Sequence, residues 1–282
     1  MLDLFSPLPP AARAENRRAY RSFLADRDGK IDVARRTLSR REERMARHLR
    51  PMPRTRPLDR VLFERQYRSF DPQVETPEEM VLLLALVKTN AAEAYGVERA
   101  FDRVYRRSVR EHDDLELVLL IEESYHTKIL LSSSNLYGLE VKAPFTPRAA
   151  LRALIGGIAD MPEFVARPIT LAAEVLGTLT FLSLLGAAGR VLKDDPELRD
   201  EVEERIIEIL VDEIGHVSFN RTCLGSAGLA QAQMLLPLIA RGLKDTIVEM
   251  GALGAGITPD PAMLVGPRSL LPEAVRATAF LA

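Results

Sequence analysis

The chain has 282 residues, of which 47% are hydrophobic and 28% are charged, and its formal net charge is −2. These values are ordinary for a soluble globular protein with one large domain or two small ones. The small net charge gives no electrostatic reason to expect nucleic acid or an anionic membrane as a partner. A single cysteine, Cys223, excludes an internal disulfide and fits a reducing cytoplasm, where we expect the protein to act.

Two segments of the sequence bear on targeting and membrane insertion. Residues 1–25 lack the continuous apolar stretch of a secretory signal. The most apolar run, 169–191, is long enough for a transmembrane helix, but it contains Glu174 and Arg190. A buried carboxylate needs a cationic partner or a metal ion, so we interpret the run as a buried helix of a protein that does not enter membranes.

The segments ahead of residue 76 predict an N-terminal helical extension, residues 1–75, that packs on the rest of the chain. In chain order they are one or two basic helices in 10–50, with a turn at 26–29, a linker at 51–57 and a short helix at 58–69. The stretch 35–50 is dense in arginine. A solvated helix face is the preferred interpretation, and a docking surface for an acidic partner is the alternative.

Residues 76–282 predict a four-helix bundle followed by a C-terminal helix and a tail. Four long segments show helical periodicity: 76–107, 113–135, a third from 163 or 168 to 192, and 195–222. A connecting helix is expected at 145–159, and a fifth helix at 229–250, kinked or split by Pro237. No segment alternates with a period of two over a convincing length, so the sequence predicts an all-α fold.

Two of the long segments contain the same short motif, a glutamate three residues before a histidine. The motifs are Glu123 to His126 and Glu213 to His216. On an α-helix this spacing points both side chains off one face, which is the geometry needed to share a metal ion. The other two histidines, His48 and His112, lie in charged surroundings and are interpreted as surface residues.

Two further glutamates lie on the predicted inward stripes of the other two long helices. Glu93 follows Leu83, Leu86 and Asn90 at helical spacing, and Glu174 is surrounded by apolar residues. For the first position Glu98 is the alternative ligand. For the second position Asp160 and Glu163 are weaker alternatives beside a turn.

The repeated (Asp/Glu)-Glu-x-x-His pattern resembles the ferritin-like diiron carboxylate superfamily, close to its oxygenase branch, over residues 76 to 220. The resemblance implies a dinuclear centre in the bundle. Its ligands would be Glu93, Glu123, His126, Glu174, Glu213 and His216. Glu123 and Glu213 would bridge the two metals, and Glu93 and Glu174 would each bind one. The preceding acids would orient the imidazoles, Asp212 toward His126 and Glu122 toward His216.

The resemblance implies an oxidoreductase that uses two iron ions, or a manganese and iron pair, with O2 as co-substrate. Glu123, Glu213 and Tyr125 are its predicted catalytic residues. Length and helix layout resemble the arylamine N-oxygenases of biosynthetic pathways, but that group has a further histidine ligand where this chain has Ile209. We therefore expect either N-oxygenation of an amine or C–H hydroxylation of a small organic substrate.

The sequence also bears on the electron donor and on the oligomeric state of the protein. No flavin, nicotinamide or iron–sulfur motif is visible in the sequence, so the electrons must come from an external donor. The oligomeric state is left open, with a homodimer as one option. The alternative function is a non-catalytic ferritin-like bundle that binds metal for storage or stability.

Overall fold

The computed structural model describes residues 3–49, 57–111 and 115–281. The predicted linker at 51–57, the predicted start of the second bundle helix at 113–114 and His112 lie wholly or largely outside these ranges. The described chain is mostly helical, which confirms the all-α prediction. It divides into two compact units, one made of residues 1–23 and 162–282 and the other of residues 24–161. The predicted division of the chain at residue 75 stays a prediction.

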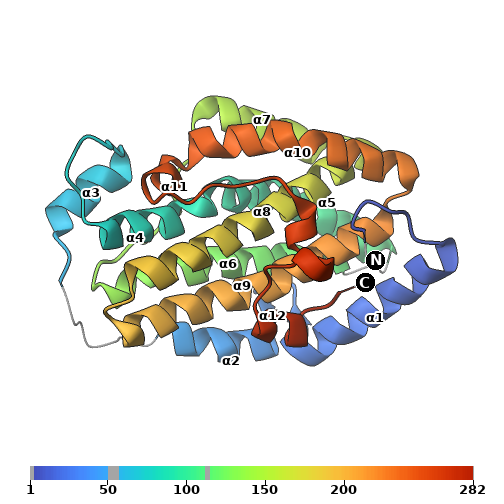
Figure 1. The fold of residues 1–282 in the computed structure, drawn as a ribbon. Helices are drawn as coiled ribbons and strands as arrows, with labels where there is room; N and C mark the ends of the chain where they lie inside the picture. The colour runs from blue at the N-terminus through green and yellow to red at the C-terminus, as the bar shows by residue number, and fades with distance from the viewer. Residues whose placement is uncertain (1–2, 50–56, 112–114, 282) are drawn as a thin grey trace. The chain divides into compact units, whose positions relative to one another are not determined.

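Unit 24–161 begins within helix α1 (Pro10–Asp28) and contains the helices that follow it. These are α2 (Ser39–His48), α3 (Arg60–Arg68), α4 (Glu78–Thr89), α5 (Ala91–Glu111), α6 (Leu115–Leu136) and α7 (Ala149–Asp160). Helix α6 is central to the unit, because α2, α4 and α5 all pack on it (Figure 1). Helix α7 packs on α5, where Arg103 donates a hydrogen bond of 3.0 Å to the carbonyl of Met161.

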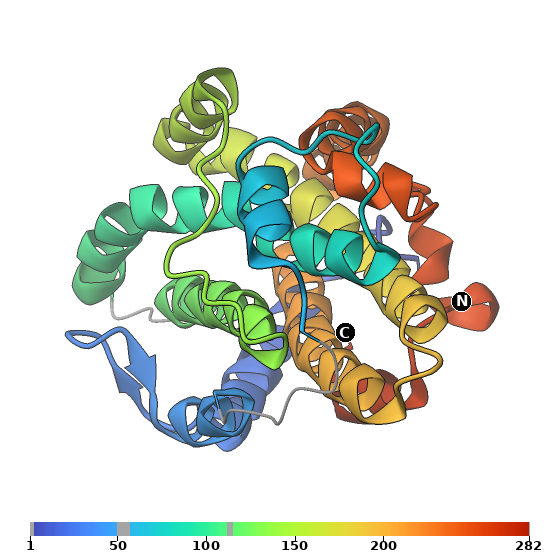
Figure 2. The same cartoon turned by 90° about the vertical axis from the view of Figure 1, so that its left-hand side faces the viewer.

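A two-stranded hairpin, which the sequence did not predict, precedes α2 (Figure 2). Its strands are β1 (Ile31–Asp32) and β2 (Thr37–Leu38), paired antiparallel with Ile31 opposite Leu38. Strands of two residues are too short to show a period of two in the sequence. Gly29 has a φ of +78°, a conformation that glycine adopts without strain, and this allows the chain to turn from α1 into β1.

The first long helix predicted over 76–107 is two helices in the structure, α4 and α5, separated at Asn90. Residues Leu82 to Leu86 of α4 have no exposed surface. Burial of one leucine side chain contributes about 1.5–3 kcal/mol to folding, so α4 is a major part of the core.

Unit 1–23 with 162–282 is built on a pair of long helices, α8 (Glu163–Val191) and α9 (Pro196–Cys223), which pack side by side (Figure 1). Asp195 caps α9 by accepting a hydrogen bond from the Leu198 amide, as the Asp-Pro start predicts. Helix α10 (Ser226–Thr246) packs on α8 and continues through Pro237 without splitting. The elements that follow are α11 (Val248–Ala252), the 3₁₀ turns η1 (Pro261–Met263) and η2 (Gly266–Arg268), and α12 (Glu273–Thr278).

The surface interpretation of His48 is wrong, since its side chain is only 3% exposed. Arg41, Met45 and His48 recur along α2 at spacings of four and three and form its buried face, and α2 packs on α6. The arginines between these positions obscure that face in the sequence, because long charged side chains can cover apolar surface with their stems.

Two helical stretches, Glu78–Tyr105 and Glu163–Val191, are long and apolar enough to cross a membrane by length and composition alone. Buried core helices pass the same test, and 67% and 50% of their most apolar windows are buried. This is weak support for a membrane location, and the absence of a membrane partner stays a prediction.

Candidate metal centre

Unit 24–161 brings together three of the predicted ligands. Glu93 comes from the first turn of α5, and Glu123 and His126 come from one face of α6. One ligand atom from each residue lies within 4.8 Å of the others. The His126 Nδ1 atom is 2.9 Å from Glu123 Oε2, and the His126 ring is fully buried. We call these three residues the α5–α6 triad.

Unit 1–23 with 162–282 brings together the other three. Glu174 comes from α8, and Glu213 and His216 come from one face of α9. Their ligand atoms also lie within 4.8 Å of one another, and His216 Nδ1 is 3.6 Å from Glu174 Oε2. Gly177 of α8 lies opposite Glu213, because a Cβ atom added there would be 3.4 Å from Glu213 Oε2. We call these three residues the α8–α9 triad.

Each triad therefore has two carboxylates and one imidazole whose Nδ1 atom faces a carboxylate. Oxygen ligands with an imidazole suit iron and manganese. Glu174 Oε2 is buried and accepts no hydrogen bond from the described residues, and its side chain is only 11% exposed. A buried carboxylate oxygen without a donor is costly unless a cation or a proton balances it, so the residues present fit a metal ion.

The structure decides between the alternative carboxylates. Glu98 is 67% exposed and pairs with Arg36 at 3.0 Å, so it is a surface residue rather than a member of the α5–α6 triad. Glu163 pairs with Arg167 and is 53% exposed, and Asp160 is exposed at the end of α7. Glu93 and Glu174, the preferred ligands, are the ones that lie beside the motif residues.

Asn90, at the break between α4 and α5, links Glu93 to the residue that follows His126. Its side-chain amide donates to Glu93 Oε2, and its carbonyl oxygen accepts from the hydroxyl of Thr127. The chain of hydrogen bonds therefore runs from α6 through the helix break to the carboxylate of Glu93. Sequence reasoning did not assign Asn90 or Thr127 a role, although a polar residue in an otherwise apolar stripe was a signal.

We expect Asn90→Ala to lower the affinity of the protein for ferrous iron or manganese by about tenfold. Residues that orient metal ligands typically contribute a factor of 10 to 100. Titration of metal-free protein with Mn²⁺ followed by calorimetry measures the change. Thr89→Ala is the matched control, because the Thr89 hydroxyl donates only to the Ala85 carbonyl of its own helix. Equal affinities in the two variants would remove Asn90 from the metal centre.

Tyr125, predicted to be catalytic, directs its hydroxyl toward the hairpin and α2. The oxygen accepts a 3.2 Å hydrogen bond from the Leu38 amide, and the hydroxyl donates to Glu42. Burial and the hydrogen bond to Glu42 raise the pKa of Tyr125 well above its usual range. These contacts give Tyr125 a structural role in joining α6 to α2, and a catalytic role for it stays a prediction.

Tyr125→Phe should lower the free energy of unfolding by about 1–2 kcal/mol at neutral pH, because the buried Leu38 amide loses its acceptor. The contribution should be fully present below the ordinary tyrosine pKa near 10 and lost at higher pH, since the folded protein favours the neutral phenol. Urea unfolding at several pH values measures this difference in the free energy of unfolding. Tyr67→Phe is the control, because the Tyr67 hydroxyl donates to Ala143 near the surface and should contribute less.

The remaining predicted residues are all buried. Glu122 is 1% exposed and Asp212 is 2% exposed, and their roles in orienting the imidazoles stay predictions. A Cβ atom added at Gly215 would lie 3.0 Å from the Tyr20 ring, so the ring packs directly against this glycine. Tyr20 also stacks on Phe219, so Gly215 serves the packing of α1 on α9.

No protein-family model matches the chain, and comparisons with curated proteins and with solved structures find no match.

Proposed function

We propose that the two triads hold the two metal ions of one dinuclear centre, and that the protein is a non-haem diiron oxygenase. The observation that carries the proposal is the repetition of one ligand set, two carboxylates and an imidazole, in each of the two compact units. A dinuclear carboxylate centre in a four-helix bundle requires this set twice. The ferritin-like arrangement of α4–α5, α6, α8 and α9 is part of the same proposal.

In this centre Glu123 and Glu213 would be shared between the metals, and Glu93 and Glu174 would each hold one. The histidines would hold the metals through Nδ1, the nitrogen that faces a carboxylate in both triads. Their Nε2 atoms would then be left for the predicted orienting acids, Asp212 for His126 and Glu122 for His216. This division follows the general pattern in which a ligating imidazole donates its other N–H to a carboxylate.

Two bound iron ions would supply the redox capacity to reduce O2 and oxidise an organic molecule. The chain's own contribution is to hold the ligands and to exclude water. Ile206, Ile209 and Leu210 of α9 and Val175 of α8 have no exposed surface, so the helices that carry the α8–α9 triad are surrounded by apolar side chains. A dry environment strengthens electrostatic interactions and prevents loss of the oxidant to solvent.

The proposed substrate is a small organic molecule, oxidised either at an amine nitrogen or at a C–H bond. The electrons come from a separate donor protein or reductant.

The decisive experiment combines metal analysis with O2 consumption. Metal-free protein is loaded with ferrous iron, reduced with dithionite and exposed to O2 in the presence of arylamines or of apolar substrates. We expect about two irons per chain and O2 uptake matched by product. The Glu98→Ala variant, altered at a surface carboxylate of α5, should behave like the wild type. Stoichiometric metal without oxidation of any organic substrate would favour the storage or structural alternative. Absence of bound metal would refute the proposal.

A further inference from the structure

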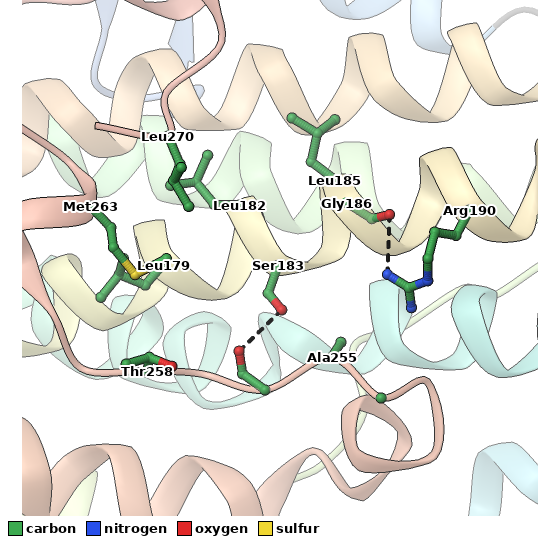
Figure 3. Close-up of a pocket in the computed structure, with 12 residues that line it drawn as sticks. Leu179, Leu182, Ser183, Leu185, Gly186, Arg190, Ala255, Thr258, Met263 and Leu270 are labelled. Atoms are coloured by element: carbon green, nitrogen blue, oxygen red, sulfur yellow. Dashed lines mark hydrogen bonds between the residues drawn. The ribbon is translucent and has the colours of Figure 1, made fainter. Parts of the chain in front are cut away.

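A cavity of about 500 Å³ lies in unit 1–23 with 162–282, between α8 and the segment that follows α11 (Figure 3). Its α8 wall includes Leu179 and Leu182, and the facing wall includes Met263 and Leu270. This volume is in the range of small-molecule sites, which are mostly apolar with a few placed polar groups. None of the triad residues lines the cavity, so it is a separate feature of the unit.

Among the described residues that line this cavity, Arg190 alone is charged. Its guanidinium group donates hydrogen bonds to two backbone carbonyls, of Leu253 at 2.8 Å and of Gly186 at 3.4 Å, and Figure 3 shows the second of these. No carboxylate of the described residues pairs with it. Because a guanidinium group has five N–H donors, donors remain for a ligand after these two bonds.

The facing wall is held to α8 by specific contacts. The Ser183 hydroxyl donates to the Gly256 carbonyl at 3.3 Å (Figure 3), and Arg190 donates to the Leu253 carbonyl. The cation is therefore positioned before a ligand arrives, which reduces the entropy lost on binding.

We propose that this cavity binds an apolar carboxylate, a molecule with a hydrocarbon body and one anionic end. The leucines and Met263 would contact the hydrocarbon, and Arg190 would bind the carboxylate. A planar guanidinium group matches the geometry of a carboxylate better than a lysine ammonium does. The inference goes beyond the proposed oxygenase function and does not depend on metal, because the site lies within one unit and contains no triad residue.

The contribution of the ligand's negative charge is tested first, by titrating the full-length protein with decanoate and with decan-1-ol in a calorimeter. Decanoate should bind more tightly than the alcohol. Arg190→Gln should weaken decanoate binding by about tenfold more than it weakens decanol binding, the effect of one charge-assisted contact at an exposed arginine. Equal binding of the two compounds, equal loss for both in the variant, or no binding of either would overturn the proposal.

The cavity itself is tested by filling it. An added Cβ atom at Gly186 meets no atom within 4 Å, so Gly186→Leu places a side chain in open space at the cavity wall. It should weaken the binding of both ligands by tenfold or more. Gly242→Leu is the matched control, because it alters a helical glycine of α10 that also has open space and lies outside the cavity. Unchanged affinity in Gly186→Leu would show that decanoate binds elsewhere.

A second filling variant keeps the test decisive if Gly186→Leu does not fold, as judged by circular dichroism. Met263→Trp enlarges the opposite wall at the partly exposed turn η1, away from the helix interior. It should also reduce the binding of both compounds, and retention of full affinity would contradict the assignment. All titrations are repeated with metal-free and iron-loaded protein. Because the cavity holds no triad residue, loss of iron should not change the affinity for decanoate.

Discussion

Glu213→Ala should leave almost no iron bound to the purified protein, rather than half of the wild-type amount. The proposed centre has Glu213 as a bridge between both metals, so its loss removes a ligand from each. It also removes one of the two carboxylates of the α8–α9 triad. Elemental analysis after reconstitution with ferrous iron measures the metal content per chain.

The amount of iron that remains in Glu213→Ala also shows whether the two triads bind metal independently. If each triad bound its own metal independently, the α5–α6 triad would be intact in this variant and one iron per chain would remain. Glu123→Ala tests the other bridge and should give the same near-complete loss. Glu98→Ala, at an exposed carboxylate that pairs with Arg36, should keep the wild-type metal content.

Glu174→Leu should stabilise the metal-free protein and destabilise the iron-loaded one. Glu174 Oε2 is buried without a hydrogen bond, and the residues beside it in the helix, such as Leu171 and Val175, have no exposed surface. Without metal, removal of this carboxylate should raise the free energy of unfolding by about 1–3 kcal/mol. In a chain of this size, each kcal/mol corresponds to about 2–4 °C in the melting temperature.

The sign should reverse when iron is present, because the wild type then gains the free energy of metal binding and the variant does not. At a metal concentration 1,000 times the dissociation constant this linkage contributes about 4.1 kcal/mol, which exceeds the gain of about 1–3 kcal/mol expected without metal. Melting curves with iron and with a chelator give the comparison. Glu163→Leu, on the same helix but exposed and paired with Arg167, should show no reversal. A change of the same sign in both conditions would mean that Glu174 does not bind the metal.

The sequence by itself determined the helices and which side chains share a face. The helix predicted from 163 or 168 to 192 ends one residue later than α8, which begins at Glu163. The helix predicted over 195–222 begins and ends one residue earlier than α9, and Asp195 caps α9. The pairing of Glu123 with His126 on one face of α6 also followed from spacing alone. These features are local, because the rise and turn of a helix fix the relation between residues three or four apart.

Helical periodicity also placed Glu93, and not Glu98, on the apolar stripe, and Glu93 lies beside the α6 motif in the structure. The same reasoning failed for His48, which is buried although its neighbours are charged. It also failed for the long helix at 76–107, which breaks at Asn90. At that position the side chain bonds to Thr127, a residue of another helix, and no local pattern could reveal the contact.

Only the tertiary structure decided the contacts between segments far apart in the chain. It brought Glu93 to the α6 motif and Glu174 to the α9 motif, directed the Tyr125 hydroxyl to Leu38, and placed Tyr20 against Gly215. It also formed the cavity at Arg190, whose walls come from α8 and the C-terminal segment. The physical reason is that such contacts depend on how whole helical faces pack, whereas sequence spacing specifies only the face that each residue occupies.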